Sequence, residues 1–331
     1  MRLLIDCQAL DLYPSWPHND AHGGTETMVK KLASGLAGLG HTVHVVAYGL
    51  RDSEQRGPQE FWWTREAHPT KADCVIMVPS LEHLEPYTAP LLVCATNGLG
   101  HNLGPNGDGI PAVDAWPVFS QVHANLLHSM QGVPLDKCHV TGLGVESQEY
   151  TFVRQMIGDE QADELFLHLD NITKIPGRIL VGNDPQRGLW HVLDIFDEVK
   201  ARVPHATLHI TYDVLKVFDT LRWQAHAMSQ LLLDCERRIN ADPAITLLGN
   251  VSRAELIREQ LECQVHVWPS DPPNIGSQIH GGIMGMECAA AGAAIVVSDV
   301  EAMPETFGGV ATILPVTGTY IPSAERRITA E

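Results

Sequence analysis

The chain has 331 residues, of which 44% are hydrophobic and 19% are charged, and its formal net charge is −18. The length is sufficient for two domains that each bury a hydrophobic core, and the composition is that of a globular protein. The strongly negative charge argues against a broad nucleic-acid-binding groove and against binding to an anionic membrane surface.

The positions of cysteine, histidine and apolar residues indicate the redox compartment and test for metal sites and membrane segments. The seven cysteines are scattered, odd in number and without a CxxC pair, which favours a reduced, cytoplasmic setting. The 17 histidines are dispersed, and neither HExxH nor paired His and Cys spacing indicates a metal site. No apolar run approaches the roughly 20 residues that span a bilayer, so we expect no transmembrane segment. The N-terminal MRLLIDCQAL becomes polar too early for a signal peptide.

The first half of the chain alternates strand-like and helix-like segments. A short apolar strand at 2–7 precedes a loop that contains Gly23 and Gly24, and apolar residues at helical spacing then run to Gly40. This order predicts a βαβ unit with a glycine-rich turn between strand and helix. The Gly-Gly pair is typical of close approach by a phosphate or sugar, and a tight turn alone is an equal alternative. Further strands are expected at 42–48, 74–79, 91–96, 117–120 and 138–141.

The second half restarts the alternation after an acidic stretch. Residues 147–176 are expected to form a helix and a linker, and they contain the expected boundary between domains 1–165 and 166–331. Alternation in both halves predicts an α/β fold of two Rossmann-like, doubly wound parallel-sheet domains that face a cleft. In such folds, ligands bind beyond the carboxyl ends of the strands. The expected strands are 178–182, 206–212, 245–248, 265–268 and 294–298, and helices are expected from 189, 223 and 252.

The stretch 269–304 carries the clearest site signal. A loop rich in Pro, Asn and Gly leads through His280, Gly281 and Gly282 into a short apolar helix. The unpaired N–H groups and the positive dipole end at such a helix start favour a diphosphate. Glu287 lies inside this helix among apolar residues, where a carboxylate is costly unless it is paired. A pair of sugar hydroxyls would supply that partner, and a neighbouring Lys or Arg is the alternative.

Four segments that span most of the chain carry a recognisable pattern. They are GGTETMVKKLASGLAGLGHTVHVV, FSQVHANLLHSMQGVPLDKCHVTGLGVE, ILVGNDPQRGLWHVLDIFDEVKARVPHATLHI and ITLLGNVSRAELIREQLECQVHVWPSD, the last followed by GIMGMECAAAGAAIVVSD and MPE. In this order they resemble the GT-B glycosyltransferases of the family-4 type. The resemblance implies the GT-B fold and transfer of a sugar from a nucleotide donor with retention of configuration.

The resemblance assigns the diphosphate to a basic pair that follows the first strand of the second domain. Arg187 occupies one of the two positions, and Asn183 stands at the other, so half of the pair is missing. Arg178 or Lys174, acting from a shifted position, is the alternative second cation. A cation at a helix start is disfavoured by the helix dipole, which supports an anionic ligand for Arg187.

The resemblance also implies which positions face the rest of the donor. Gly23 and Gly24 fall on the family's glycine loop, near the donor phosphates and the acceptor. Glu287 falls on the second acid of the E-x7-E motif, which holds the ribose hydroxyls. Ile279 stands where the first acid, which contacts the donor sugar, is expected. The chain therefore resembles a divergent member of the family, and His280 and Gln278, which flank the gap, are candidate replacements.

Two further departures concern the first domain and the C-terminus. Many members of the family carry a His after a first-domain strand. Asn97 follows that strand here, and His101 is the nearest candidate. The chain ends soon after Pro315, where the family continues with further helices, so we expect a C-terminally short variant.

We therefore expect a retaining, metal-independent glycosyltransferase that moves a hexosyl or pentosyl group from a UDP- or GDP-sugar to a hydroxyl acceptor. Arg187 and the helix start at Gly281 and Gly282 would neutralise the leaving diphosphate, and His101 is the second catalytic candidate. No cofactor is expected, because no Asp-x-Asp metal motif lies near this site. The acceptor class stays open among glycans, lipids, small molecules and modified DNA.

Two other functions compete with this expectation. Ile279 and the short C-terminus favour a non-catalytic or degenerate nucleotide-sugar-binding protein. The compact size allows a glycosyltransferase acting on modified DNA, although the net charge of −18 argues against it. An NAD-dependent Rossmann enzyme is disfavoured, because no G-x-G-x-x-G follows the first strand.

Overall fold

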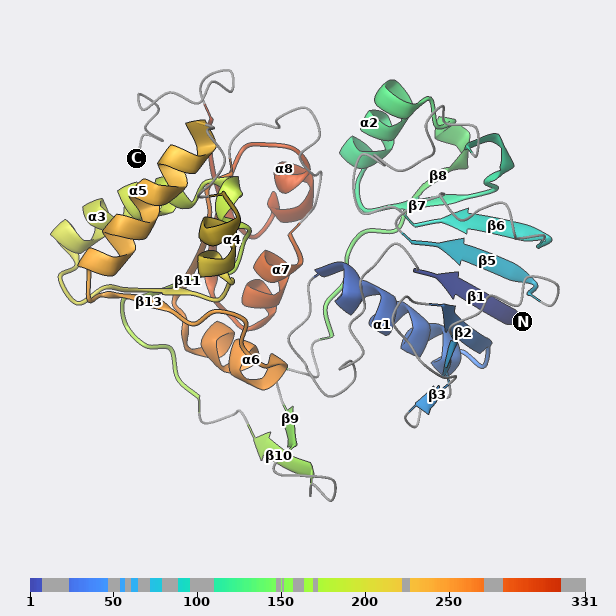
Figure 1. Ribbon diagram of the computed structural model, residues 1–331, viewed down its shortest axis with the longest axis horizontal. Helices are drawn as coiled ribbons and strands as arrows, with labels where there is room; N and C mark the ends of the chain where they lie inside the picture. Colours follow the sequence, from blue (N-terminus) through green and yellow to red (C-terminus); the bar gives the residue numbers. More distant parts are fainter. Residues whose placement is uncertain are drawn as a thin grey trace. The chain divides into compact units, whose positions relative to one another are not determined.

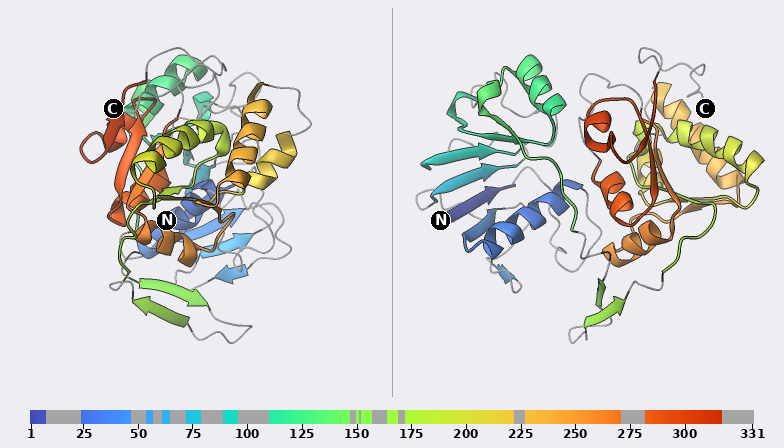
Figure 2. Two further views of the ribbon diagram at one scale, coloured as in Figure 1. Left: turned by 90° about the vertical axis from the view of Figure 1, so that its left-hand side faces the viewer. Right: turned by 180° about the vertical axis from the view of Figure 1, so that it is seen from behind.

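Two compact units make up the described chain, one ending at Leu143 and the other beginning at Gly144. Each unit is built on its own sheet, and in the computed structural model the first sheet is coloured blue to cyan (Figures 1 and 2). The structure describes residues 1–7, 24–46, 54–56, 61–64, 72–78, 89–95, 110–146, 150, 152–156, 164–168, 172–221, 227–270 and 282–316.

The first unit contains a six-stranded sheet. Parallel strands that are covered on both faces form continuous apolar runs, which is why the runs at 2–7, 74–79 and 91–96 predict strands correctly. All neighbouring strands are parallel except the outermost pair at 54–56 and 61–64. In spatial order the strands are β3 (Glu54–Arg56), β4 (Phe61–Thr64), β2 (Thr42–Val46), β1 (Arg2–Asp6), β5 (Cys74–Met77) and β6 (Leu91–Cys94).

The two faces of this sheet bury different side chains, because successive residues of a strand point to opposite sides. Leu3 belongs to a core cluster with Val29, whereas Leu4 belongs to a separate cluster with Leu127. The remaining elements of this unit are α1 (Gly24–Gly38), which carries Val29, α2 (Gln121–Gln131), which carries Leu127, β7 (Trp116–Val118), β8 (Cys138–Val140), η2 (Ile110–Ala112) and η3 (Leu135–Lys137).

The second unit contains a six-stranded sheet in which all neighbours are parallel. In spatial order its strands are β13 (Ile245–Leu247), β12 (Thr207–Ile210), β11 (Arg178–Val181), β14 (Val265–Trp268), β15 (Ala294–Ser298) and β16 (Thr312–Leu314). The chain order reverses at β11, because β12 and β13 extend the sheet from one of its edges and β14 to β16 from the other. Open α/β sheets bind ligands beyond the carboxyl ends of the strands at such a reversal.

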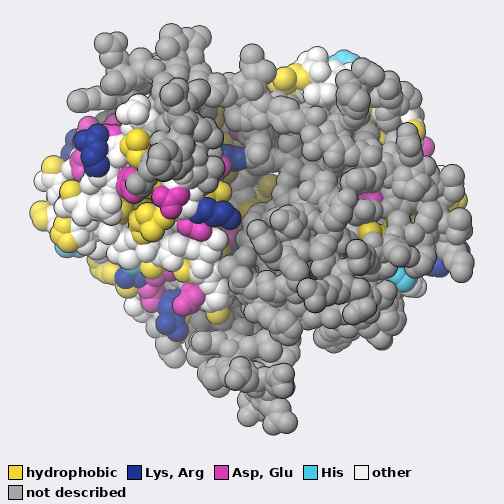
Figure 3. Space-filling view, viewed as in Figure 1, with side chains coloured by type: hydrophobic (Ala, Val, Ile, Leu, Met, Phe, Trp, Pro, Cys, Tyr) yellow, Lys and Arg dark blue, Asp and Glu magenta, His cyan; other side chains and the backbone are white. Residues whose placement is uncertain are grey.

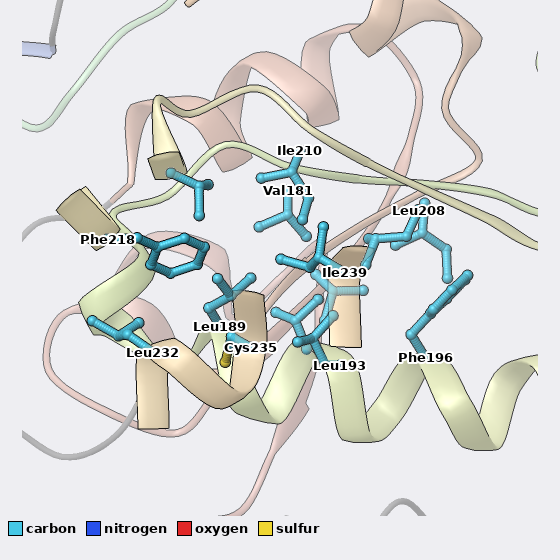
Figure 4. Packing of buried hydrophobic residues seen from close by; sticks show 14 of the residues in the cluster. Val181, Leu189, Leu193, Phe196, Leu208, Ile210, Phe218, Leu232, Cys235 and Ile239 are labelled. Carbon is cyan, nitrogen blue, oxygen red and sulfur yellow. The ribbon is translucent and has the colours of Figure 1, made fainter. Parts of the chain in front are cut away.

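Helices cover both faces of this second sheet, as a doubly wound fold requires. Val181 and Phe196 belong to the core cluster on one face, where Val181 lies beside Ile210 (Figure 4). The preceding residue, Leu180, belongs with Cys288 to the cluster on the other face. The expected fold class of two Rossmann-like α/β domains is confirmed. The helices are η5 (Pro185–Arg187), α3 (Leu189–Arg202), α4 (Val214–Leu221), α5 (Ala227–Ala241), α6 (Arg253–Glu262), α7 (Ile283–Ala290) and α8 (Met303–Phe307).

The expected helix within residues 147–176 is wrong. The described part of this stretch contains β9 (Phe152–Met156) and β10 (Glu164–His168), which pair antiparallel with Val153 opposite Leu167. Aromatic and β-branched side chains in these two segments favour strands, and a hairpin satisfies their backbone groups locally.

Contacts of this stretch tie its described residues to the second unit. β9 contacts α6, and Tyr150 belongs to a core cluster with Ile257 of α6. The contacts therefore group the described residues of 144–270 and 282–316 with the second unit. The domain limits 1–165 and 166–331 stay an expectation from the sequence.

Within the described ranges, no helix combines the length and the apolar character that crossing a bilayer requires. In the same ranges, no group of three or more His, Cys, Asp or Glu side chains is arranged to hold a metal ion. All seven cysteines lie in described positions and are free thiols.

A matched pair of leucines tests the core of the second unit. Leu193 is 1% exposed and Leu215 is 51% exposed. We expect Leu193→Ala to lower the free energy of unfolding by about 2–5 kcal/mol, because it leaves a cavity between α3 and the sheet. Leu215→Ala should change it by less than about 0.5 kcal/mol. Urea denaturation followed by circular dichroism measures both, and equal losses would contradict this packing.

Candidate functional site

The candidate site lies at the carboxyl edge of the second sheet. Because all six strands are parallel, the loops that follow β11, β14 and β15 leave the sheet at this same edge. The loop after β11 contains Asn183 and Arg187, the loop after β14 begins at Pro269, and the loop after β15 contains Glu301. The predicted diphosphate residues of the second domain thus lie on the edge where α/β sheets bind ligands.

Close packing ties these loops together. A Cβ atom on Gly188, which has a φ of +99°, would lie 2.2 Å from the carbonyl oxygen of Pro269. A Cβ atom on Gly182 would lie 2.8 Å from the Cε atom of Met284, in the first turn of α7. The Ser298 hydroxyl donates a hydrogen bond of 2.6 Å to the carbonyl oxygen of Ser270. The ends of β11, β14, β15 and α7 therefore form one packed group of loops.

The start of α7 requires a glycine. Gly282 is the N-cap residue, with a φ of +54°, and a Cβ atom there would lie 1.8 Å from the Trp268 ring. No side chain caps the helix at this residue. The first N–H groups of an α-helix have no partner within the helix, and its dipole attracts anions. The geometry therefore agrees with the anion-binding role predicted for this helix start, and that role stays a prediction.

Arg187 is the cation predicted to contact the diphosphate, and it lies in the loop after β11. It is the last residue of η5, and its backbone N–H donates a hydrogen bond of 2.9 Å to the carbonyl oxygen of Asp184. Its charge acts on the carboxyl group of Glu301, whose pKa it lowers. Glu301 thus lies on the same loop edge as Arg187.

Sequence reasoning missed Glu301. It has a φ of +53° and is the one non-glycine residue with positive φ in the described chain. Backbone strain of this kind in a non-glycine residue is concentrated at functional sites. Burial raises the pKa of its carboxyl group to about 7, and the opposing effect of Arg187 is smaller. The sequence shows only an acid in a loop after a strand, and it contains no signal for the φ angle or the burial.

Glu287 is 5% exposed and is held by α6. One of its oxygens, Oε1, lies 2.8 Å from Nη1 of Arg253, and the other, Oε2, accepts a hydrogen bond of 2.9 Å from Nε2 of Gln260. The predicted alternative, a basic partner, is therefore present. A carboxylate has about four acceptor sites, so these contacts leave room for hydroxyl donors, and the ribose-binding role stays a prediction.

Arg178 and Lys174 do not serve as the second cation of the basic pair. Arg178 is the first residue of β11, at the opposite end of the strand, where it pairs with Glu262 and lies 3.7 Å from Glu259. The Lys174 ammonium donates hydrogen bonds of 3.1 Å and 2.8 Å to the carbonyl oxygens of Gln260 and Ala291. Both cations have structural partners, so Arg187 and Asn183 remain as the predicted pair.

Several predicted residues fall outside the described residues. They include the catalytic candidate His101 and the position of the missing acid, Ile279. For Gly24, the structure describes only the backbone, as the first residue of α1. The roles of these residues stay predictions from the sequence, as do those of Gly23, His280 and Gly281.

The sequence matches no protein-family model, and comparison with curated proteins finds no match. Solved structures do match. AviGT4, a glycosyltransferase involved in avilamycin A biosynthesis, is 14% identical, with 97% of this chain and 86% of that chain covered and a TM-score of 0.64. Sucrose-phosphate synthase from Thermosynechococcus elongatus is 12% identical over 95% of this chain and 86% of that chain, with a TM-score of 0.61.

A third similar structure is HepE of Anabaena, solved in complex with UDP and glucose. It is 12% identical, with 95% of this chain and 86% of that chain covered and a TM-score of 0.57. At such identities the likeness shows the fold alone. The chain thus has the fold of the GT-B glycosyltransferases, as the resemblance implies.

The pKa of Glu301 predicts a pH-dependent contribution to stability. The carboxyl group binds its proton more tightly in the folded chain, where its pKa is about 7, than at its ordinary value of 4.5. Its contribution is therefore fully present below about pH 4.5 and is lost as the pH rises through about 7. Between about pH 5 and pH 8, wild type should lose more unfolding free energy than Glu301→Gln does.

Urea denaturation at a series of pH values measures this difference. Glu305→Gln, which removes an exposed carboxylate from nearby α8, is the matched control and should follow wild type. Parallel pH profiles for wild type and Glu301→Gln would show that Glu301 is not buried in this way.

Proposed function

We propose that this protein is a glycosyltransferase that moves a sugar from a nucleoside-diphosphate sugar to a hydroxyl acceptor. The observation that carries the proposal is that the Arg187 loop and the start of α7 pack together at the carboxyl edge of the second sheet. The buried Glu287 lies about one turn further along α7. A cation and a helix start suit a diphosphate, and a buried carboxylate suits a pair of hydroxyls. A nucleoside diphosphate contains both groups.

The proposed chemistry places charge stabilisation on the second unit. When the bond between the sugar carbon and the diphosphate oxygen breaks, negative charge develops on the leaving diphosphate. Arg187 and the N–H groups that follow Gly282 stabilise this charge. The acceptor hydroxyl bonds to the sugar carbon and passes its proton to an oxygen of the leaving diphosphate. Retention of configuration and metal independence are parts of the proposal that rest on the family resemblance. His101 is included as a catalytic candidate on the sequence alone.

UDP is the first donor nucleotide to test, and GDP is the second. The fold is similar to that of HepE, which was solved with UDP and glucose, and this likeness supports the choice. We propose that no metal or organic cofactor takes part. Seven free thiols in one chain support a reducing, cytoplasmic location.

The acceptor is proposed only as a hydroxyl compound, a glycan, lipid or small molecule. Modified DNA is the least favoured acceptor, because the net charge is −18. Basic side chains are interspersed with acidic ones on the described face of the second unit (Figure 3). Arg238, for example, pairs with both Asp194 and Asp197. Paired cations of this kind are poor contacts for a phosphate backbone.

A turnover assay separates the enzyme from a nucleotide-sugar-binding protein. The assay measures release of UDP or GDP from the corresponding sugars with a panel of hydroxyl acceptors. Release that depends on an acceptor supports the transferase. Tight donor binding without release supports the binding protein, which Ile279 favours. Absence of any nucleotide binding would overturn both.

Arg187→Ala tests the proposed diphosphate contact. Loss of a charged hydrogen bond costs about 1.5–3 kcal/mol, so the Kd for UDP or GDP should rise about 10- to 100-fold. Arg237→Ala is the matched control, because Arg237 is 78% exposed on α5 and pairs only with a neighbour on its own helix in the described chain. Isothermal titration calorimetry measures both, and equal Kd values for wild type and Arg187→Ala would remove Arg187 from the site.

A further inference from the structure

A buried polar network joins α6, α7 and the segment that enters the second unit. Glu287 of α7 forms an ion pair with Arg253 of α6, with Oε1 2.8 Å from Nη1, and its Oε2 atom accepts a hydrogen bond of 2.9 Å from Gln260. Gln260 is fully buried, and its Oε1 atom accepts a hydrogen bond of 3.3 Å from the Tyr150 hydroxyl. Its Nε2 atom also lies 3.2 Å from the Sδ atom of Met284.

The local sequence explains how α6 presents two partners to one carboxylate. Ser252 and Glu255 form a capping box that fixes the first turn of α6, and Arg253 is the first residue of that turn. Gln260 follows seven residues later, two turns along the same face of the helix. A cation in the first turn is unfavourable for the helix dipole, and Glu287 offsets that cost.

Stability alone is a poor reason for this arrangement. Buried ion pairs seldom stabilise a protein more than well-packed apolar residues of similar volume do. The contacts of this network do not, however, fill all the hydrogen-bond acceptor sites of the Glu287 carboxylate. Among the described residues, Oε1 of Glu287 pairs with Arg253 and Oε2 accepts from Gln260, so each oxygen has a second acceptor site. Two open acceptor sites on neighbouring oxygens suit the two O–H groups of a vicinal diol.

We propose that Arg253 and Gln260 are positioning residues that hold the Glu287 carboxylate with its open acceptor sites toward the ribose diol of the donor. This inference rests on the proposed function. It names the residues on which the selectivity of the nucleotide site for a ribose depends. Arg253 fixes one oxygen of the carboxylate, and Gln260 fixes the other. The diol then meets a preorganised acceptor pair.

Tyr150 sets the orientation of the Gln260 amide. Its hydroxyl donates to Oε1, which leaves the amide NH₂ group directed at Glu287. The reverse orientation would place the amide oxygen against the carboxylate, where two acceptors repel each other. Tyr150 therefore acts on the carboxylate through Gln260.

The test compares UDP with 2′,3′-dideoxy-UDP, and GDP with its 2′,3′-dideoxy form, by isothermal titration calorimetry on the full chain. The ratio of the two Kd values isolates the ribose hydroxyls from the diphosphate. Wild type should prefer the ribose form by about 10- to 100-fold. Arg253→Met and Glu287→Gln should bring this ratio below about 3, with the Kd of the dideoxy form unchanged within about 3-fold. Arg253→Lys, which keeps the charge but not the planar fork, should give an intermediate ratio.

The matched control is Arg258→Met, an exposed cation on the same helix, which should keep the wild-type ratio. A loss of structure would weaken both ligands together, whereas a positioning role changes their ratio. If Arg253→Met does not fold, Arg253→Lys and Tyr150→Phe carry the test, and an unchanged ratio in both overturns the inference.

Failure of the inference and failure of the proposed function give different results. A wild-type ratio in Arg253→Met, with the ratio lost in Glu287→Gln, overturns the positioning role and leaves the proposed function intact. A ratio near 1 in wild type, with tight binding of both forms, overturns the assignment of Glu287 to the ribose. No binding of either UDP or GDP overturns the proposed function and the inference with it.

Discussion

Parallel pairing along both edges of β11 is the constraint on which the second unit and its candidate site depend. The connection after β11 leads to α3 on one face of the sheet, and the connection after β14 leads to α7 on the other. The two loops therefore leave in opposite directions and meet only at the carboxyl edge, where Gly188 touches Pro269. The position of Arg187 and of the start of α7 follows from this strand order.

The candidate site combines several features that lower the stability of the folded state. A glycine without room for a Cβ atom starts α7 at Gly282, and a non-glycine residue with positive φ stands at Glu301. The side chain of an acidic residue, Glu287, is buried. The large apolar clusters on both sheet faces supply the stability that allows such features to persist.

Most of the framework was predictable from the sequence, whereas side-chain pairing across elements was not. Buried parallel strands such as β11 and β14 form short apolar runs with Gly or Pro beyond them, and this pattern is local. The hairpin of β9 and β10 has a weaker pattern, because polar residues interrupt FVRQM and Gly158 is a lone glycine between the two strands. The pairing of Arg253 with Glu287 depends on the packing of α6 against α7, which no spacing in the sequence specifies. The φ angle of Glu301 depends on the loops around it in the same way.

The discontinuity of the site along the chain has a thermodynamic consequence. Its residues come from segments that extend from Asn183 to Glu301, so they meet only when almost the whole second unit is folded. An unfolded chain has no comparable affinity, and any ligand of these loops therefore stabilises the folded state by RT ln(1 + [L]/Kd). The resistance of this unit to unfolding and proteolysis is therefore expected to rise with the concentration of any ligand that these loops bind.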